Sequence, residues 1–145
     1  MNKWTERFLN LSDNISNWSK DSTKVGAVIT TRDNRIVSIG YNGFPAGCND
    51  DKEERKQRPL KYLWTEHAER NAIYNACKTG ANLTDTIIYL RWFPCADCAR
   101  GIIQSGIKKV VCGRPDLNTP KWGEHFKVSL EMFEECSIEV VFSDE

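Results

Sequence analysis

Apolar residues recur at helical spacing in four stretches of the chain. In the first stretch, residues 4–18, an apolar side chain appears every three or four positions. This spacing places the side chains on one face of an amphipathic helix, and we expect its aromatic residues, Trp4 and Trp18 included, to pack in the core. The same periodicity predicts three further helices, over residues 66–79, 94–106 and 122–133. Gly80 and Gly106 stand at the ends of two of these patterns, where glycine commonly terminates a helix.

Five short runs of β-branched and aromatic residues alternate with these helices. The expected strands cover residues 25–30, 36–41, 86–90, 109–112 and 137–142. A turn at Asp33-Asn34 joins the first two strands into an antiparallel hairpin. Each later strand is separated from the next by a helix, and right-handed crossovers make such strands largely parallel. The pattern therefore predicts one α/β domain over residues 1–145, a three-layer α/β/α sandwich around a mixed five-stranded sheet.

Three segments lack this patterning. Residues 49–61 mix acidic and basic side chains, which predicts a mobile, solvated loop. Residues 19–24 combine hydroxyl groups with two lysines, so they form either a solvated turn or a contact for a phosphate group. Residues 42–47 contain two glycines, an asparagine and a proline, which suit either a plain loop or the close approach of a ligand.

Composition and charge exclude several function classes. The 145 residues are 40% hydrophobic and 28% charged, as in a soluble globular domain, and 20 basic side chains balance 20 acidic ones. A nucleic-acid-binding surface usually shows as a basic excess, so we expect no nucleic-acid partner. No apolar run is long enough to cross a bilayer, and the N-terminus lacks the apolar centre of a signal peptide. We therefore expect a cytoplasmic protein with no membrane partner.

The chain contains six cysteines, and two of them carry the candidate chemistry. Without an export signal, a disulfide framework is not expected. Cys77, Cys112 and Cys136 fall on helix or strand patterns and are expected to be buried thiols, while Cys48 lies in a loop.

His67, Glu69, Cys95 and Cys98 form the inventory of a catalytic zinc site. Cys95 and Cys98 are three residues apart at the start of a predicted helix, so their sulfurs share one face and can bind one ion. His67 completes three ligands and leaves the fourth position to water. Glu69 is two residues from His67, about 200° around a helix, and so is better placed beside that water than on the metal.

These motifs resemble the zinc-dependent cytidine and deoxycytidylate deaminase superfamily. The signature H-x-E followed by P-C-x-x-C is met by His67-Ala68-Glu69 and by Pro94-Cys95-Ala96-Asp97-Cys98. Within the superfamily, the chain is most similar to the deoxycytidylate (dCMP) deaminases. The stretches that carry this closer resemblance are residues 23–27, 40–43, 67–73 and 98–107.

The resemblance implies the cytidine deaminase-like fold and the hydrolysis of dCMP to dUMP and ammonia, which feeds dTMP synthesis. Zinc would generate hydroxide at neutral pH for attack on C4 of cytosine. Glu69 would take the proton of that water and pass protons to the ring nitrogen and to the departing ammonia.

The resemblance also suggests binding residues and regulation. It places Asn42 near the sugar hydroxyl and the backbone of Ala68 near the base; candidates for the phosphate contact are Ser19, Lys20 and Lys24. Enzymes of this kind are often homohexamers, or else dimers, and bind dCTP or dTTP as effectors, with Mg²⁺ accompanying the nucleotide. The residues that this regulatory site would involve are Gly40, Tyr41, Gly43 and Phe44. Some relatives hold a second zinc with a histidine, but residues 49–66 contain none, so one Zn²⁺ per chain is expected.

Several alternatives stay open at this point. Some relatives carry an aromatic residue where this chain has Arg114-Pro115-Asp116, which leaves dCTP or another nucleotide or nucleobase as a possible substrate. Free nucleosides, guanine and adenosine in tRNA are substrates elsewhere in the superfamily. A structural zinc module would need a fourth ligand from Cys48, Cys112 or His125. A redox Cys-x-x-Cys pair would leave His67 and Glu69 without a role.

Overall fold

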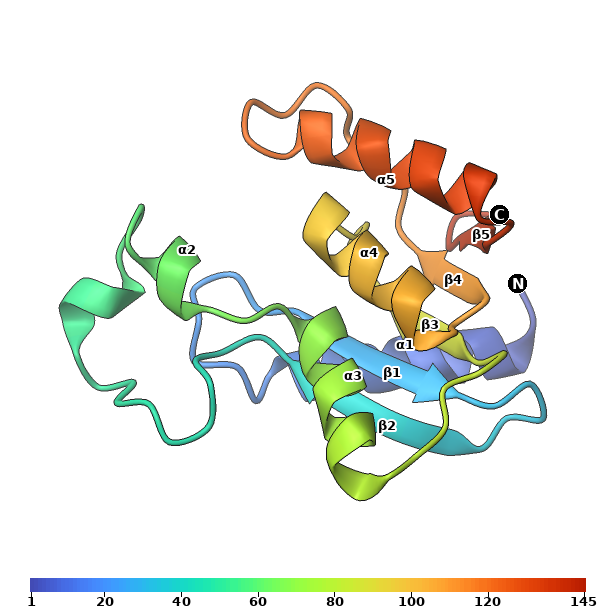
Figure 1. Ribbon diagram of the computed structural model, residues 1–145, viewed down its shortest axis with the longest axis horizontal. Coiled ribbons are helices and arrows are strands. Elements are labelled where there is room, and N and C mark those ends of the chain that lie inside the picture. Colours follow the sequence, from blue (N-terminus) through green and yellow to red (C-terminus); the bar gives the residue numbers. More distant parts are fainter.

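Five strands form one mixed sheet in the order β2-β1-β3-β4-β5. The computed structural model describes residues 1–145 (Figure 1). The strands are β1 (Gly26–Thr30), β2 (Ile36–Tyr41), β3 (Ile87–Leu90), β4 (Lys109–Cys112) and β5 (Glu139–Phe142). β1 is antiparallel to both β2 and β3, whereas β3, β4 and β5 run parallel. The predicted order, a hairpin followed by parallel strands, is confirmed.

Helices cover both faces of this sheet. They are α1 (Lys3–Ser16), α2 (Lys61–Trp64), α3 (Ala68–Thr79), α4 (Ala96–Ser105) and α5 (Gly123–Glu135), with a short 3-10 helix, η1 (Glu53–Lys56). α1 lies behind the sheet, and α3, α4 and α5 lie in front of it (Figure 1). The three-layer α/β/α sandwich is therefore confirmed. None of these helices combines the length and the apolar character that crossing a membrane requires.

Alternation along the central strands divides the core in two. On β3, Ile88 and Leu90 pack toward α3, α4 and α5, while Ile87 and Tyr89 pack toward α1. Successive side chains of a strand point to opposite faces, so a strand that is apolar throughout supplies both cores. All four residues of β3 are buried, which explains the unbroken apolar run in its sequence.

Four side chains that were expected in the core, Trp4, Trp18, Cys77 and Cys136, are exposed. Trp18 lies beyond the end of α1, is 55% exposed and touches the ring of Tyr41 at 6.0 Å between centroids. Cys77 and Cys136 are also exposed. Cys77 is about 100° around α3 from the buried Ala76, and Cys136 follows the last residue of α5, so neither faces the sheet. Trp4 is 39% exposed, whereas Cys112 is buried as expected.

The segment between β2 and α3 contains structure that its charge pattern did not predict. Residues 49–61 were expected to be a solvated loop, but they include η1 and the start of α2. The segment extends beyond the N-terminal end of α3 at the left of Figure 1. Lys61 anchors it: its Nζ lies 2.9 Å from Asp21 Oδ1, and both side chains are nearly buried, at 7% and 11% exposed. The anchor pairs residues 40 positions apart, which no local pattern reveals.

β2 packs directly on α3 at Gly40. A Cβ atom on Gly40 would lie 2.6 Å from the carbonyl oxygen of Ala68 and 2.8 Å from Cα of Ala72, and closer still to the amide nitrogen of Ala72. These are backbone atoms and cannot rotate away. The glycine at this position therefore has a packing reason that is independent of any ligand.

The substitution Gly40→Ala is expected to destabilise the fold by about 3 kcal/mol, since overpacking a rigid contact forces the backbone to shift. Gly43→Ala is the matched control, because a Cβ there meets no atom within 4 Å, and its effect should stay within about 0.5 kcal/mol. Urea denaturation of the two variants measures the difference. Equal stabilities would contradict the close contact between β2 and α3.

Candidate active site

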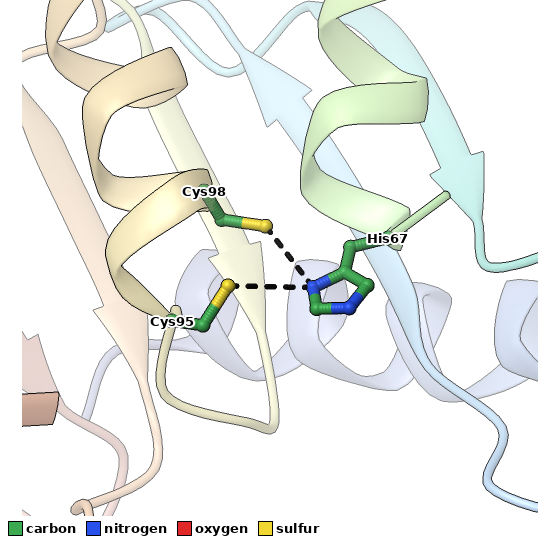
Figure 2. Close-up of side chains that lie close together, drawn as sticks. All are labelled: His67, Cys95 and Cys98. Carbon is green, nitrogen blue, oxygen red and sulfur yellow. Dashed lines mark hydrogen bonds between the residues drawn. The ribbon is translucent and has the colours of Figure 1, made fainter. Parts of the chain in front are cut away.

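The three candidate metal ligands meet between the starts of two helices. His67 is the N-cap residue of α3, and Cys95 is the N-cap residue of α4. Each of them therefore immediately precedes the first turn of its helix. Cys98 follows in the first turn of α4. His67 Nδ1 lies 3.5 Å from Cys95 Sγ and 3.4 Å from Cys98 Sγ (Figure 2). The predicted trio is thus brought together from positions 28 and 31 residues apart.

The donor set fits a tetrahedral zinc ion. With Zn–N near 2.0 Å and Zn–S near 2.3 Å, tetrahedral angles separate nitrogen and sulfur by roughly 3.5 Å. The distances in the cluster are close to this value, and all three ligand atoms lie within 4.8 Å of one another. Cysteine sulfur and histidine nitrogen are the ligands that zinc prefers. His67, Cys95 and Cys98 can therefore hold one zinc ion without rearrangement.

The pKa values of the two thiols in the cluster are shifted in opposite directions. The hydrogen bond with Cys98, together with the neighbouring His67, lowers the pKa of the Cys95 thiol to about 4. The same bond and burial raise the pKa of Cys98 well above its ordinary value. Cys95 is therefore the more acidic of the two thiols, and a metal that binds both sulfurs displaces the proton of Cys98.

Glu69 lies beside the cluster without belonging to it. It is in the first turn of α3, is 4% exposed and lines the same cavity as His67 and Cys95. Burial raises the pKa of its carboxyl group. A carboxyl group in this position is suited both to accept and to return a proton.

α5 holds the start of α4 in place. His125 Nδ1 accepts a hydrogen bond from the amide of Ala96 at 3.1 Å, and Ser129 Oγ donates one to the carbonyl oxygen of Pro94 at 2.9 Å. His125 is therefore a helix cap for α4, a role that the sequence did not reveal. None of the three candidate fourth ligands, Cys48, Cys112 and His125, belongs to the cluster. The structure therefore does not form a structural zinc site with four protein ligands.

A cavity of about 350 Å³ opens over the cluster. Asn42, Ala68 and Glu69, all of them sequence-predicted site residues, line it. Asn42 is held firmly, because its Oδ1 accepts from the amide of Val25 at 2.9 Å and its Nδ2 donates to the carbonyl oxygen of Thr23 at 2.7 Å. Thr65 also borders the cavity, and its Oγ1 is the one buried side-chain polar atom with no hydrogen-bond partner.

The structure does not bring the three candidate phosphate residues to this cavity. Ser19 is buried, donates to the carbonyl oxygen of Asn42 at 2.8 Å and accepts from the amide of Asp21. Lys20 pairs with Asp50 at 3.1 Å on the surface, and Lys24 is exposed outside the lining. The cationic side chains that do line the cavity are Arg58, Lys61, Arg91 and Arg114. Arg58 and Lys61 come from the charged segment that the sequence presents as a loop.

A second cavity, of about 680 Å³, lies on the other side of Asn42. Its lining includes Tyr41, Gly43, Phe44 and Lys20. Gly40 does not line it and instead packs against α3. Three side chains border both cavities: Asp21, Asn42 and Thr65.

Comparison with known proteins identifies the family. Residues 2–114 match the model of the cytidine and deoxycytidylate deaminase zinc-binding region. The chain belongs to this deaminase family. The match includes every residue of the cluster and Glu69, so the zinc-binding interpretation of the trio and the family agree.

Curated deaminases resemble the chain over most of its length. An uncharacterized deaminase of the luxG 3′ region of Aliivibrio fischeri is 44% identical, over 98% of this chain and 95% of that protein. The deoxycytidylate deaminase of phage T4 is 33% identical, over 77% of this chain and 79% of that enzyme. The mouse deoxycytidylate deaminase is 42% identical over 75% of this chain, which spans only 64% of the mouse enzyme.

Solved structures give the same fold. The dCMP deaminase of cyanophage S-TIM5 superposes with a TM-score of 0.75, at 23% identity, over 98% of this chain and 99% of that one. The deaminase fold predicted from the motifs is therefore confirmed independently of the metal ligands.

Proposed function

We propose that this deaminase hydrolyses dCMP to dUMP with release of ammonia. The observation that carries the proposal is the cavity itself, at whose base a buried Glu69 stands beside a three-ligand cluster suited to zinc. Relatives named deoxycytidylate deaminase support dCMP as the substrate. A related cyanophage enzyme has been crystallised with dCMP and dUMP, which supports the same substrate class.

His67, Cys95 and Cys98 would hold the zinc ion, whose chemistry when bound is to make a water molecule acidic enough to act as a nucleophile near neutral pH. Glu69 accepts the proton of the attacking water and delivers it to the ring nitrogen beside C4 of cytosine. Glu69 then takes the proton of the new hydroxyl group on C4 and supplies it to the amino group as the C4–N bond breaks, so that ammonia leaves and a carbonyl forms at C4. Its raised pKa suits this exchange, because the group must carry a proton between two steps.

The remaining cavity residues orient the nucleotide. The backbone of Ala68 lies next to His67 and Glu69 at the start of α3, where it can hydrogen-bond the base. Asn42, with its amide fixed by Val25 and Thr23, borders the cavity as a rigid wall for the deoxyribose.

The second cavity supports a regulatory role as a further part of the proposal. It is large enough for a nucleotide such as dCTP or dTTP with Mg²⁺, and its lining includes Tyr41, Gly43 and Phe44. Lys20 and Lys56 also line it, each ion-paired with a carboxylate of the same lining. The exposed aromatic side chains of Trp18, Tyr41 and Tyr74 give the surface apolar area for self-association into dimers or hexamers.

An ammonia-release assay tests the proposed substrate. With equal concentrations of dCMP, dCTP, deoxycytidine and guanine, we expect kcat/KM to be highest for dCMP by at least about 10-fold, because the chain's relatives are dCMP enzymes and each charge-assisted contact to a phosphate contributes discrimination. Higher turnover of dCTP or guanine would reassign the substrate within the family. No release from any of these by the zinc-loaded protein would contradict the proposal.

A further inference from the structure

The cations around the active-site cavity differ in what they are bound to. Three of the four are paired with carboxylates of the chain. Lys61 lies 2.9 Å from Asp21, Arg91 lies 2.9 Å from Asp13, and Arg114 lies 2.7 Å from Asp144. Because each of these charges is already compensated, a bound anion would have to compete with a carboxylate for it.

Arg58 is the exception. No carboxylate lies within ion-pair distance of its guanidinium group. Its Nε donates a hydrogen bond to the hydroxyl of Tyr62 at 2.7 Å. This bond fixes the plane of the guanidinium group and leaves both terminal nitrogens free to donate. A guanidinium held by one edge in this way presents the fork that binds phosphate oxygens in pairs.

Aromatic rings connect Arg58 to the metal cluster along one side of the cavity. The ring of Tyr62 meets the ring of Trp122 edge-on, with 6.2 Å between centroids. The ring of Trp122 in turn meets the ring of His67 edge-on, at 5.9 Å. All four of these residues line the cavity. Arg58 thus stands at the far end of an aromatic row that begins at the metal ligand His67, so a nucleotide with its base over the cluster would extend its phosphate toward Arg58.

We infer that Arg58, positioned by Tyr62, binds the 5′-phosphate of the nucleotide and sets the preference for a phosphorylated substrate. This inference rests on the proposed deamination of a cytosine nucleotide. A phosphate monoester carries a charge of about −1.5 to −2 at pH 7. Arg58 is the one cation of the cavity lining that can compensate the phosphate charge without breaking an ion pair of the chain.

Arg58→Gln is the test, with Arg55→Gln as its matched control. Arg55 belongs to the same segment, but its guanidinium lies over the ring of Trp64 at 3.8 Å and does not line the cavity. Both variants remove one positive charge from the segment, so only a direct phosphate contact separates them. We expect Arg58→Gln to lower kcat/KM for dCMP by about 10- to 100-fold, mainly through KM, while Arg55→Gln changes it less than about threefold.

Deoxycytidine and dUMP provide the readouts that a general structural defect would not reproduce. Turnover of deoxycytidine should be unchanged in Arg58→Gln, and the dissociation constant of dUMP, measured by calorimetry, should rise by the same factor as KM for dCMP. Tyr62→Phe, which removes the hydroxyl that holds Nε, should weaken dUMP binding by a smaller factor. If the wild-type protein deaminates dCMP and Arg58→Gln binds dUMP as tightly as wild type, the inference about Arg58 is wrong. If the wild-type protein deaminates no cytosine nucleotide, the proposed function fails instead.

Discussion

Replacing Glu69 by glutamine is expected to lower kcat for dCMP about 100- to 10,000-fold while the protein stays folded and keeps its zinc. Glutamine has nearly the same shape as glutamate, but it cannot accept and return a proton. Glu69 is buried beside the cluster and is not one of its three members, so the metal ligands are untouched. Ammonia release and the zinc content of the purified variant measure the two halves of this expectation.

Glu124→Gln is the matched control for that experiment. Glu124 is an exposed residue in the first turn of α5, and its substitution removes the same charge without touching the cavity. Its kcat should equal that of the wild-type protein. Near-normal ammonia release from Glu69→Gln would remove Glu69 from the proton transfers.

The second large effect is expected from Cys98→Ala. Only His67 and Cys95 would then remain as ligands, and we expect the affinity for zinc to fall more than about 100-fold. Even the loss of a group that only hydrogen-bonds to a metal ligand lowers metal affinity roughly 10- to 100-fold. Deaminase activity should disappear with the metal. Elemental analysis after dialysis against a weak chelator, together with the activity assay, measures both losses.

Cys77→Ala separates the loss of a ligand from the loss of a cysteine. Cys77 is exposed on α3 and lies outside the cluster, so its variant should retain one zinc per chain and full activity. Stoichiometric zinc in Cys98→Ala after the same dialysis would mean that another group binds the metal.

The three residues of the cluster could be predicted because they lie in two short stretches whose residue spacing carries the signal. Cys95 and Cys98 are three residues apart, and a helix beginning at that point fixes the separation of their sulfurs. The second half of the site, His67 and Glu69, also opens a helix. What the sequence did not define was the exact boundary: His67 and Cys95 are N-cap residues with extended backbones rather than first-turn residues.

The cations that line the cavity could not be predicted, because their positions depend on tertiary placement. Ser19 and Lys20 have side chains that could bind a phosphate, yet the Ser19 hydroxyl donates to the backbone carbonyl of Asn42 and Lys20 pairs with Asp50. Whether Arg58 and Lys61 reach the cavity depends on how residues 49–66 fold over it, and that segment has no apolar periodicity. Its position depends on the buried pair of Lys61 with Asp21, a contact between distant parts of the chain.

The contact at Gly40 limits the motion of α3, the helix that carries Glu69. Side chains that separate two elements can change rotamer and let the elements drift, but at Gly40 the main chain of β2 lies directly against the main chain of α3. The side chains of Ser38, Asn71 and Asn75 add hydrogen bonds from one element to the backbone of the other. The residues of α3 that face the sheet, Ala68, Ala72 and Ala76, are correspondingly small and fully buried. The carboxylate of Glu69 is thereby carried on a support with few soft degrees of freedom, and its alignment should vary little with temperature.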